Sequence, residues 1–436
     1  MNEKKSPAPL GADSLSRLFD NGNYTEIGAH ITRHADDSTP EGVVCGYGPI
    51  DGRLVFAFSQ DASSLGGAFD SRSAKKIGNL YELALKSGAP VVGIFGCGGS
   101  VITEGSSLLS GLGKLFSCIS LASGEIPQVA LVNGACTGSL AVAASMFDLT
   151  VTVKGSELAF GSAFATEADS SLAAENGVAA IEAENEAEGF AKLRSLISAL
   201  PDSAECGPAF ADETDLNRPT GIADATDAKA LIAAISDNST FIELYEKLGG
   251  GITVGFAPLA GRYVGVVAAF GEISAAGAKK ATEFVSFCST FSLPIVTLIN
   301  SEGFEVSAKA EKEGIARAIA ELAGAYRMSA GTKLSAVVGS ACGAILPAIG
   351  TREGASDVSF ALDSAIIAPM TPAKTVAFLM NDKITAEKSR EQLEAEWAKT
   401  EASAEKAAVN GDIDFIVTLD ELRPRLCSAL LMLERD

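Results

Sequence analysis

Histidine is almost absent from this sequence. Only His30 and His34 occur among 436 residues, and both precede the first full hairpin of the expected fold. A histidine general base is therefore available only if that short segment folds over the site, which we do not expect. Gly134 to Gly138 has the G-x-C-x-G spacing of a nucleophile elbow around Cys136, but an elbow enzyme expects its histidine after the nucleophile. A small structural thiol is the favoured interpretation of Cys136.

The sequence also lacks paired cysteines and a positive charge balance. Its eight cysteines are scattered without a C-x-x-C pair, so we expect no disulfide framework, no metal site, and reduced cytoplasmic thiols. A formal net charge of −21 disfavours nucleic acid and anionic lipid as partners. No apolar stretch of secretory length follows the first lysines. Residues 284–300 and 334–350 carry no charge, but polar residues and Pro or Gly interrupt them, which favours buried strands and turns over membrane spans.

What the chain does contain is a repeat. An apolar content of 47% with 44 glycines indicates a globular protein, and the length alone suggests roughly three domains at about 150 residues each. Residues 24–161 and 241–370, however, share an ordered series of features. The Ala-Lys-Lys triplets and the Pro-Val-Val and Pro-Ile-Val starts of two apolar runs recur at the same interval of 204 residues. The repeat therefore predicts a duplication with two similar domains.

The pattern within each half predicts an α/β fold. Each half opens with a hairpin at a glycine turn, at residues 48–55 and 257–264. Strands then alternate with helices of 10 to 15 residues, as in βαβ units with a largely parallel sheet. We place the boundary in the acidic stretch 202–224, which gives domains of residues 1–224 and 225–436.

Three further helices are predicted. They are an amphipathic segment from Ala187 to Leu200, a charged helix over 385–409 with Trp397 as its packing anchor, and a helix over 420–433. Plain packing is the favoured role of the last two, and contact between subunits is the alternative.

The chemistry available to this chain is that of its backbone. Both halves have glycine-rich turns that follow strands and lead into helices, where N–H groups converge and the helix dipole favours negative charge. Such a nest can hold a phosphate or an oxyanion that forms during reaction. The run from Gly96 to Ser100 matches neither G-x-G-x-x-G nor the Walker pattern, so nucleotide binding is weakly supported.

At these turns the sequence resembles the carboxyltransferase subunits of biotin-dependent acyl-CoA carboxylases and decarboxylases. That group includes propionyl-CoA carboxylase β and the methylmalonyl- and glutaconyl-CoA decarboxylases, and the likeness covers residues 14–433. The segments that carry it are Phe58-Ser59-Gln60-Asp61 with Gly66-Gly67 (family Q-D-F-T-x-x-G-G-S), Gly98 to Gly105 (G-G-A-R-I-Q-E-G), Cys136 to Ser139 (C-A-G-G), Gly255 to Arg262 (G-F-A-R-x-x-G-R), Pro294 to Phe304, and Gly411 to Asp414 with Arg423. The resemblance implies tandem duplicated crotonase-like domains, the first for acyl-CoA and the second for biotin.

The sequence departs from the family pattern at several motif positions. Val101 replaces the arginine of G-G-A-R-I, Glu302 replaces the proline of P-G-F, and residues 341–346 replace A-Y-G-G-A-Y. These changes concern the choice of substrate.

The resemblance also implies a mechanism and a set of site residues. The family moves a carboxyl group between carboxybiotin and the α-carbon of a short acyl-CoA, and the protein holds two enolate oxygens with backbone donors. By resemblance, Gly138 and Ser139 bind the thioester oxygen, and Gly343 and Ala344 bind the biotin oxygen. Residues expected to contact substrate are Gly66, Gly67, Gly98, Gly99, Ser100, Gly303, Phe304 and Leu346, and Lys75 or Lys76 would bind the phosphates of CoA because an acidic chain needs a local positive spot.

The expected cofactors are biotin on a separate carrier and coenzyme A as part of the substrate. The expected partners are a biotin carboxyl carrier, a biotin carboxylase or a membrane decarboxylase subunit, and further copies of this chain as a dimer or trimer of dimers. Two alternatives stay open: a non-catalytic structural paralogue, and a biotin-independent crotonase-like hydratase or thioesterase. A hydratase needs paired carboxylates, for which Glu104 is the only candidate.

Overall fold

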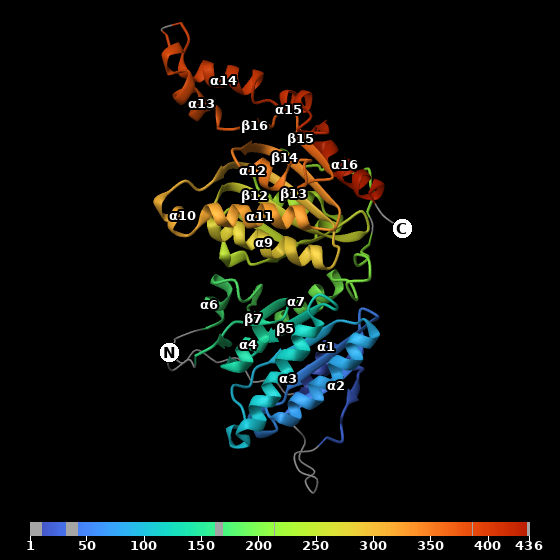
Figure 1. Cartoon of the computed structure of the whole chain (residues 1–436). Coiled ribbons are helices and arrows are strands. Elements are labelled where there is room, and N and C mark those ends of the chain that lie inside the picture. Colours follow the sequence, from blue (N-terminus) through green and yellow to red (C-terminus); the bar gives the residue numbers. More distant parts are fainter. Residues whose placement is uncertain (1–10, 32–41, 162–168, 213, 386, 434–436) are drawn as a thin grey trace. The chain divides into compact units, whose positions relative to one another are not determined.

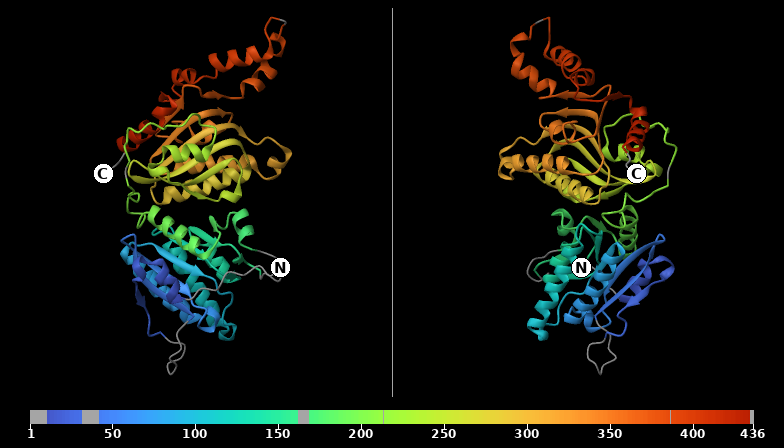
Figure 2. Two further views of the ribbon diagram at one scale, coloured as in Figure 1. Left: turned by 180° about the vertical axis from the view of Figure 1, so that it is seen from behind. Right: turned by 45° about the vertical axis from the view of Figure 1, so that its right-hand side comes forward.

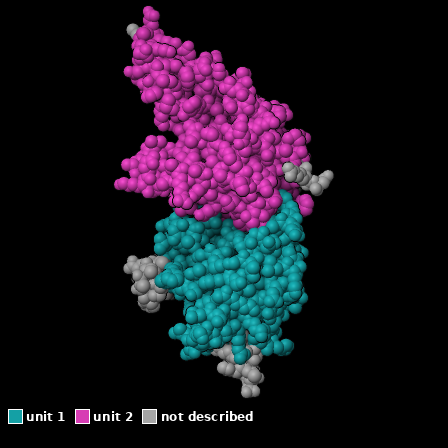
Figure 3. Space-filling view, viewed as in Figure 1, with its two compact units in different colours: residues 1–209, 245–247 teal, residues 210–244, 248–436 magenta. Residues whose placement is uncertain are grey.

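The computed structural model describes residues 11–31, 42–161, 169–212, 214–385 and 387–433. His34 lies outside these ranges. Contacts divide the chain into two compact units, of which unit 1 comprises residues 1–209 with 245–247, and unit 2 comprises residues 210–244 with 248–436 (Figure 3). This division falls inside the acidic stretch 202–224, and the short segment 245–247 belongs to unit 1.

Unit 1 is built on a seven-stranded sheet with the order β1-β2-β3-β4-β5-β7-β9. The first three strands are antiparallel, and β3 to β9 are parallel. The strands are β1 (Thr25–Ile27), β2 (Val43–Ile50), β3 (Arg53–Gln60), β4 (Val91–Phe95), β5 (Gln128–Val132), β7 (Leu149–Val153) and β9 (Ile181–Ala183), with a separate parallel pair of β6 (Ala135–Thr137) and β8 (Glu157–Ala159). Its helices are α1 (Gly11–Leu18), α2 (Ser71–Ser87), α3 (Ser106–Ala122), α4 (Ser139–Ser145), α6 (Ser170–Glu175) and α7 (Glu186–Ala199).

Unit 2 repeats this plan with the order β10-β11-β12-β13-β14-β15-β17, and β16 pairs with the end of β14. Its strands are β10 (Ile242–Leu244), β11 (Ile252–Leu259), β12 (Arg262–Ile273), β13 (Ile295–Phe304), β14 (Lys333–Cys342), β15 (Val358–Leu362), β16 (Ile366–Ala368) and β17 (Phe415–Val417). Its helices are α8 (Ala228–Ile235), α9 (Ala275–Thr290), α10 (Ala308–Lys312), α11 (Ile315–Met328), α12 (Ile345–Ile349), α13 (Pro372–Leu379), α14 (Arg390–Thr400), α15 (Ala404–Asn410) and α16 (Leu419–Met432). The α/β duplication predicted from the repeat is confirmed.

The predicted hairpins form at equivalent places in the two units. Asp51 and Gly52 connect β2 to β3 with φ of 48° and 77°, and Ala260 and Gly261 connect β11 to β12 with φ of 54° and 74°. Positive φ at both central residues defines the type I′ turn, whose twist matches that of the flanking strands. The common turn geometry shows that the halves share their local structure as well as their sequence order.

Helices cover both faces of each sheet (Figures 1 and 2). In β5, Ala130 and Val132 belong to the core under α2 and α3, whereas Leu131 points to Gly189 of α7 on the other face. Successive strand residues point to opposite faces, so a strand buried on both faces is apolar throughout. This explains the apolar runs that the sequence shows without alternation.

Three sequence-based expectations about helices are confirmed or corrected. The segments 187–200 and 420–433 form α7 and α16 as expected. The single charged helix over 385–409 is wrong: the chain forms α14 and α15, separated at Ala402, whose carbonyl accepts a hydrogen bond from the N–H of Ile367. Leu393 is the buried residue of α14, and Trp397 is half-buried.

The two charge-free runs are parts of the fold. Residues 334–350 form β14 and α12, as buried strand and turn, but residues 284–290 belong to α9 rather than to a strand. Their buried residues Phe284, Val285 and Cys288 follow helical spacing on the face toward the sheet. Among the described residues, no helix is both long and apolar enough to cross a membrane.

Candidate active site

The first nest is the backbone turn at Gly138 and Ser139, between β6 and α4. Gly138 has φ of 61° and ψ of −135°, a conformation that side chains disfavour. Its N–H lies 3.2 Å from the carbonyl oxygen of Phe160 and 3.3 Å from that of Ala159. Ser139 opens α4, and the first N–H groups of a helix have no acceptor within it. Within the described residues, Ser139 is therefore the member of the predicted pair whose N–H has no backbone acceptor.

The second nest, at Gly343 and Ala344, has the same construction. Gly343 has φ of 67°, and its N–H donates to the carbonyl of Ala368 at 3.0 Å. Ala344 follows as the residue before α12, and its N–H also has no backbone acceptor in the described part of the chain. Both residues are exposed. Each predicted pair thus places one N–H against a neighbouring strand and leaves the next one available.

Two loops of unit 1 are brought together beside the first nest. Gly98 and Gly99 are exposed after β4, and a Cβ on Gly98 would lie 3.2 Å from the Cβ of Ala135 in β6. The N–H of Phe69 donates to the carbonyl of Gly99 at 3.1 Å, and Phe69 forms a parallel bridge with Ser100. Among the predicted contact residues, Gly66, Gly67, Gly98, Gly99 and Ser100 therefore lie on two connected loops.

In unit 2 the corresponding loop ends β13. Gly303 has φ of 124°, close to the 133° of Gly99, and a Cβ there would lie 3.2 Å from the carbonyl oxygen of Cys342. Gly303 is therefore adjacent to the second nest. Phe304 is half-buried at the end of β13, whereas Leu346 is 8% exposed in the core of α12. Because it is buried, Leu346 is a packing residue of α12 more than a contact surface for substrate.

The two predicted lysines differ in their surroundings. Lys76 is 3% exposed, and its ammonium donates to Glu26 Oε1 at 3.0 Å and to the carbonyl of Val43 at 3.1 Å. Lys280, its counterpart in unit 2, is 2% exposed. A lysine buried in both halves has a structural role, and Lys75 is the one that is exposed to solvent.

The buried cysteines are poor nucleophiles. Cys136 is fully buried, and burial raises the pKa of its thiol far above the ordinary value. Burial also raises the pKa of Cys342, which the nearby Glu302 raises further and Lys374 lowers. A reactive cysteine needs the thiolate form and access, so neither thiol fits that role. All eight cysteines carry free thiols.

The one carboxylate considered for a hydratase has another task. Glu104 accepts hydrogen bonds from the backbone N–H of Ser71 at 2.8 Å and from the Ser71 hydroxyl at 3.1 Å. Ser71 is the first residue of α2, so Glu104 stabilises a helix N-terminus. This contact disfavours Glu104 as a hydratase acid.

Sequence reasoning did not single out Gln60 as a site residue. Its side chain is 2% exposed and connects the loop at Gly67 with the loop at Gly96 and Cys97. A signal was present, because the apolar inner part of β3 ends in the polar pair Ser59 and Gln60 directly before a polar loop.

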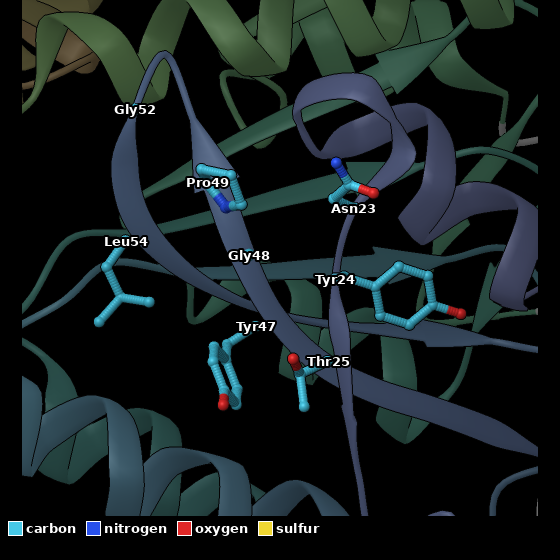
Figure 4. Close-up of a pocket in the computed structure, with 8 residues that line it drawn as sticks. All are labelled: Asn23, Tyr24, Thr25, Tyr47, Gly48, Pro49, Gly52 and Leu54. Carbon is cyan, nitrogen blue, oxygen red and sulfur yellow. The ribbon is translucent and has the colours of Figure 1, made fainter.

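A hollow of about 440 Å³ lies elsewhere in unit 1 (Figure 4). Its lining includes Tyr24 and Thr25, Tyr47 from β2, and Leu54 from the start of β3. The first nest lies at the carboxyl ends of the parallel strands, whereas Leu54 lies at the opposite end of β3. The hollow is therefore no part of the nest.

A duplicated α/β fold, with a backbone nest at the same place in each half, defines the chain as crotonase-like in architecture. The carboxyl transferase domain family matches residues 10–436, and the chain belongs to that family.

Known proteins are similar to this chain in sequence and, for one solved structure, in fold. The chain is 30% identical to the methylmalonyl-CoA decarboxylase subunit alpha of Veillonella parvula, over 97% of this chain and 89% of that protein. It is 29% identical to the propionyl-CoA carboxylase beta chain of Roseobacter denitrificans, over 97% and 90%. The crystal structure of transcarboxylase 12S, a hexamer with hydrolysed methylmalonyl-coenzyme A bound, matches with a TM-score of 0.91 and 26% identity, over 98% of this chain and 91% of that one. These matches agree with the resemblance that the motifs indicated.

Proposed function

We propose that this chain is the carboxyltransferase component of a biotin-dependent acyl-CoA carboxylase or decarboxylase. The observation that carries the proposal is the repeated nest: a glycine with its N–H held by a strand carbonyl, followed by a residue with an available N–H, at Ser139 and at Ala344. Carboxyl transfer between a thioester and biotin needs two oxyanion sites, and this chain carries two.

The first nest serves the acyl-CoA. The N–H of Ser139 donates to the thioester oxygen as negative charge develops on it, with a second donor from the exposed loop Gly98 to Ser100 beside β6. A backbone donor of this kind contributes about 3 kcal/mol to transition-state stabilisation. The exposed Lys75 is the member of the lysine pair suited to a phosphate of CoA.

The second nest fits the ureido oxygen of biotin. That oxygen is a hydrogen-bond acceptor, and the available N–H of Ala344 is a donor on an exposed turn. Biotin, when bound, would supply the carboxyl group and the base for the α-proton. The chain's task is then to orient the two reactants and stabilise charge, which suits a protein with two histidines, one of them the exposed His30.

The proposal includes a homo-oligomer whose active site combines the first nest of one copy with the second nest of another. Exposed apolar side chains beside the first nest support a partner surface there: Phe160 is 78% exposed directly after β8, and Ile102 is 84% exposed after the Gly98 loop. A biotin carrier, on a separate protein or domain, completes the assembly. The cytoplasmic setting and the division at residue 224 into an acyl-CoA half and a biotin half stay predictions.

Incubation of the purified chain with propionyl-CoA and a carboxylated biotin carrier tests the proposal. Methylmalonyl-CoA is the expected product, detected by mass. A chain that binds the carrier but yields no carboxylated product from any short acyl-CoA would instead be a structural paralogue. A hydrated or hydrolysed acyl-CoA formed without biotin would support the hydratase or thioesterase alternative.

A further inference from the structure

We propose that Gln60 is a positioning residue that sets the spacing of the two acyl-CoA loops of unit 1. This inference rests on the proposed function of the first nest. Gln60 is the last residue of β3, and its side chain is 2% exposed. It acts through the loops, because its polar atoms are turned to the backbone of the protein.

The hydrogen-bonding capacity of the amide is fully used. Its Nε2 donates to the carbonyl of Gly67 at 2.9 Å and to that of Cys97 at 3.1 Å. Its Oε1 accepts from the N–H of Gly96 at 3.0 Å and of Cys97 at 3.1 Å. A primary amide has two donors and an oxygen with two lone pairs, so all four positions are occupied. One side chain therefore joins both loops that carry the predicted acyl-CoA contacts.

The loops approach each other as closely as their composition permits. Gly67 has φ of 73°, and a Cβ there would lie only 2.3 Å from the Sγ of Cys97. The contact therefore needs glycine at position 67, and the amide of Gln60 holds its carbonyl in place. A shift of this loop would move Gly66 at the exposed turn and, through Cys97, the exposed Gly98.

Unit 2 has no glutamine at the position that corresponds to Gln60. Phe56 pairs with Val91 and Gly265 with Ile295, so counting along the two strands makes Ala269 the counterpart of Gln60. There β12 continues to Ile273, and its pairing with Gly303 and Phe304 holds the loop by backbone hydrogen bonds. The glutamine is thus a property of the acyl-CoA half alone and not a requirement of the shared fold.

The test compares two buried glutamines of the same unit. Gln60→Met removes all four side-chain bonds at nearly constant volume. Gln128→Met is the matched control: Gln128 is fully buried, accepts from the Tyr81 hydroxyl at 2.8 Å and donates to the Ile119 carbonyl at 3.1 Å, at the opposite end of β5 from the nest. Calorimetry with propionyl-CoA measures binding, and hydrogen exchange measures the protection of the Gly96 and Cys97 amides.

Gln60→Met is expected to weaken propionyl-CoA binding at least about tenfold and to raise its KM more than it lowers kcat, since small misplacements at a site can cost up to about a hundredfold. It is also expected to speed amide exchange at Gly96 and Cys97. Gln128→Met is expected to leave propionyl-CoA binding and the amide exchange of Gly96 and Cys97 unchanged, even where it lowers the melting temperature as much as Gln60→Met does. If Gln60→Met does not fold, Gln60→Glu replaces it, because a carboxylate keeps the two accepted bonds and loses the two donated ones.

Equal binding and equal exchange in the wild-type protein and a folded Gln60 variant would overturn the positioning role while leaving the proposed function standing. Equal losses of propionyl-CoA binding and amide protection in the Gln60 and Gln128 variants would also overturn the positioning role, because they would reflect general destabilisation. A wild-type protein that binds no acyl-CoA, with its carrier present, would remove the proposed function and this inference together.

Discussion

Replacement of Ser139 by proline removes one N–H group and little else. Ser139 is the first residue of α4, the position at which proline is best tolerated in a helix because its N–H has no helical acceptor. The preceding Gly138 has ψ of −135°, outside the helical region that a following proline disfavours. Ser139→Pro therefore deletes the available donor of the first nest with the turn preserved, whereas a proline at Gly138 itself would require a φ that proline cannot adopt.

The available donor of the second nest can also be replaced by proline. Ala344 has φ of −73°, within the range that proline fixes, so Ala344→Pro keeps the φ of that residue. Loss of one oxyanion donor lowers kcat by about a hundredfold to a thousandfold. Each variant should show such a loss in carboxyl transfer, at a melting temperature close to that of the parent.

Matched controls separate the N–H from the side chain. Ser139→Ala and Ala344→Ser keep the backbone donor and should retain kcat within about threefold, because no donor of the kind that carries oxyanion stabilisation is lost. Steady-state rates of methylmalonyl-CoA formation, with circular dichroism to verify folding, are the assay. A folded Ser139→Pro protein with the parental kcat would refute the role of the first nest, and a serine-to-alanine loss of the same size would transfer that role to the hydroxyl.

Three further outcomes follow from the buried groups. Cys136→Ala should keep kcat/KM within about tenfold, since the nest depends on its N–H groups; an inactive but folded variant would restore the cysteine nucleophile. Arg423→Met should lower the free energy of unfolding by about 3–5 kcal/mol, because it removes the cation that pairs with the fully buried Asp237. Arg317→Met, at an exposed pair, should change the free energy of unfolding by less than about 1 kcal/mol. Equal losses for the two variants in denaturant melts would contradict this. Burial raises the pKa of Asp148 to about 7, above its unfolded value, so unfolding releases a proton and stability should fall from pH 4 to pH 7. Asp148→Asn should flatten that slope, and an unchanged slope would assign it to other groups.

The sequence allowed the duplication and the places of both nests to be predicted, because each depends on local order. The interval of 204 residues reappears in the matched φ values of Gly99 and Gly303, and the turns at Gly52 and Gly261 have the same geometry. These features need a specific backbone conformation at one residue, and glycine marks such positions in a sequence.

The details that sequence reasoning missed depend on contacts between distant segments. The N–H of Gly138 is paired because β8 runs beside β6, and the predicted long helix ends because Ile367 bonds to Ala402. The burial of Lys76 was within reach, since Ala74, Ile77 and Tyr81 place a buried face on the same helix. Its ion-pair partner Glu26, fifty residues earlier in the sequence, could not be predicted from that pattern.

The most direct test of the account follows a label from biotin to the acyl group. Biotin carrier carboxylated with ¹³C is mixed with propionyl-CoA and the wild-type, Ser139→Pro or Ala344→Pro protein, and NMR follows the labelled carboxyl group that becomes bonded to the α-carbon. The account predicts ¹³C-labelled methylmalonyl-CoA with the wild-type protein and a rate at least about a hundredfold lower with either folded variant. Undiminished transfer of the label by both folded variants would contradict the claim that these two backbone donors carry the reaction.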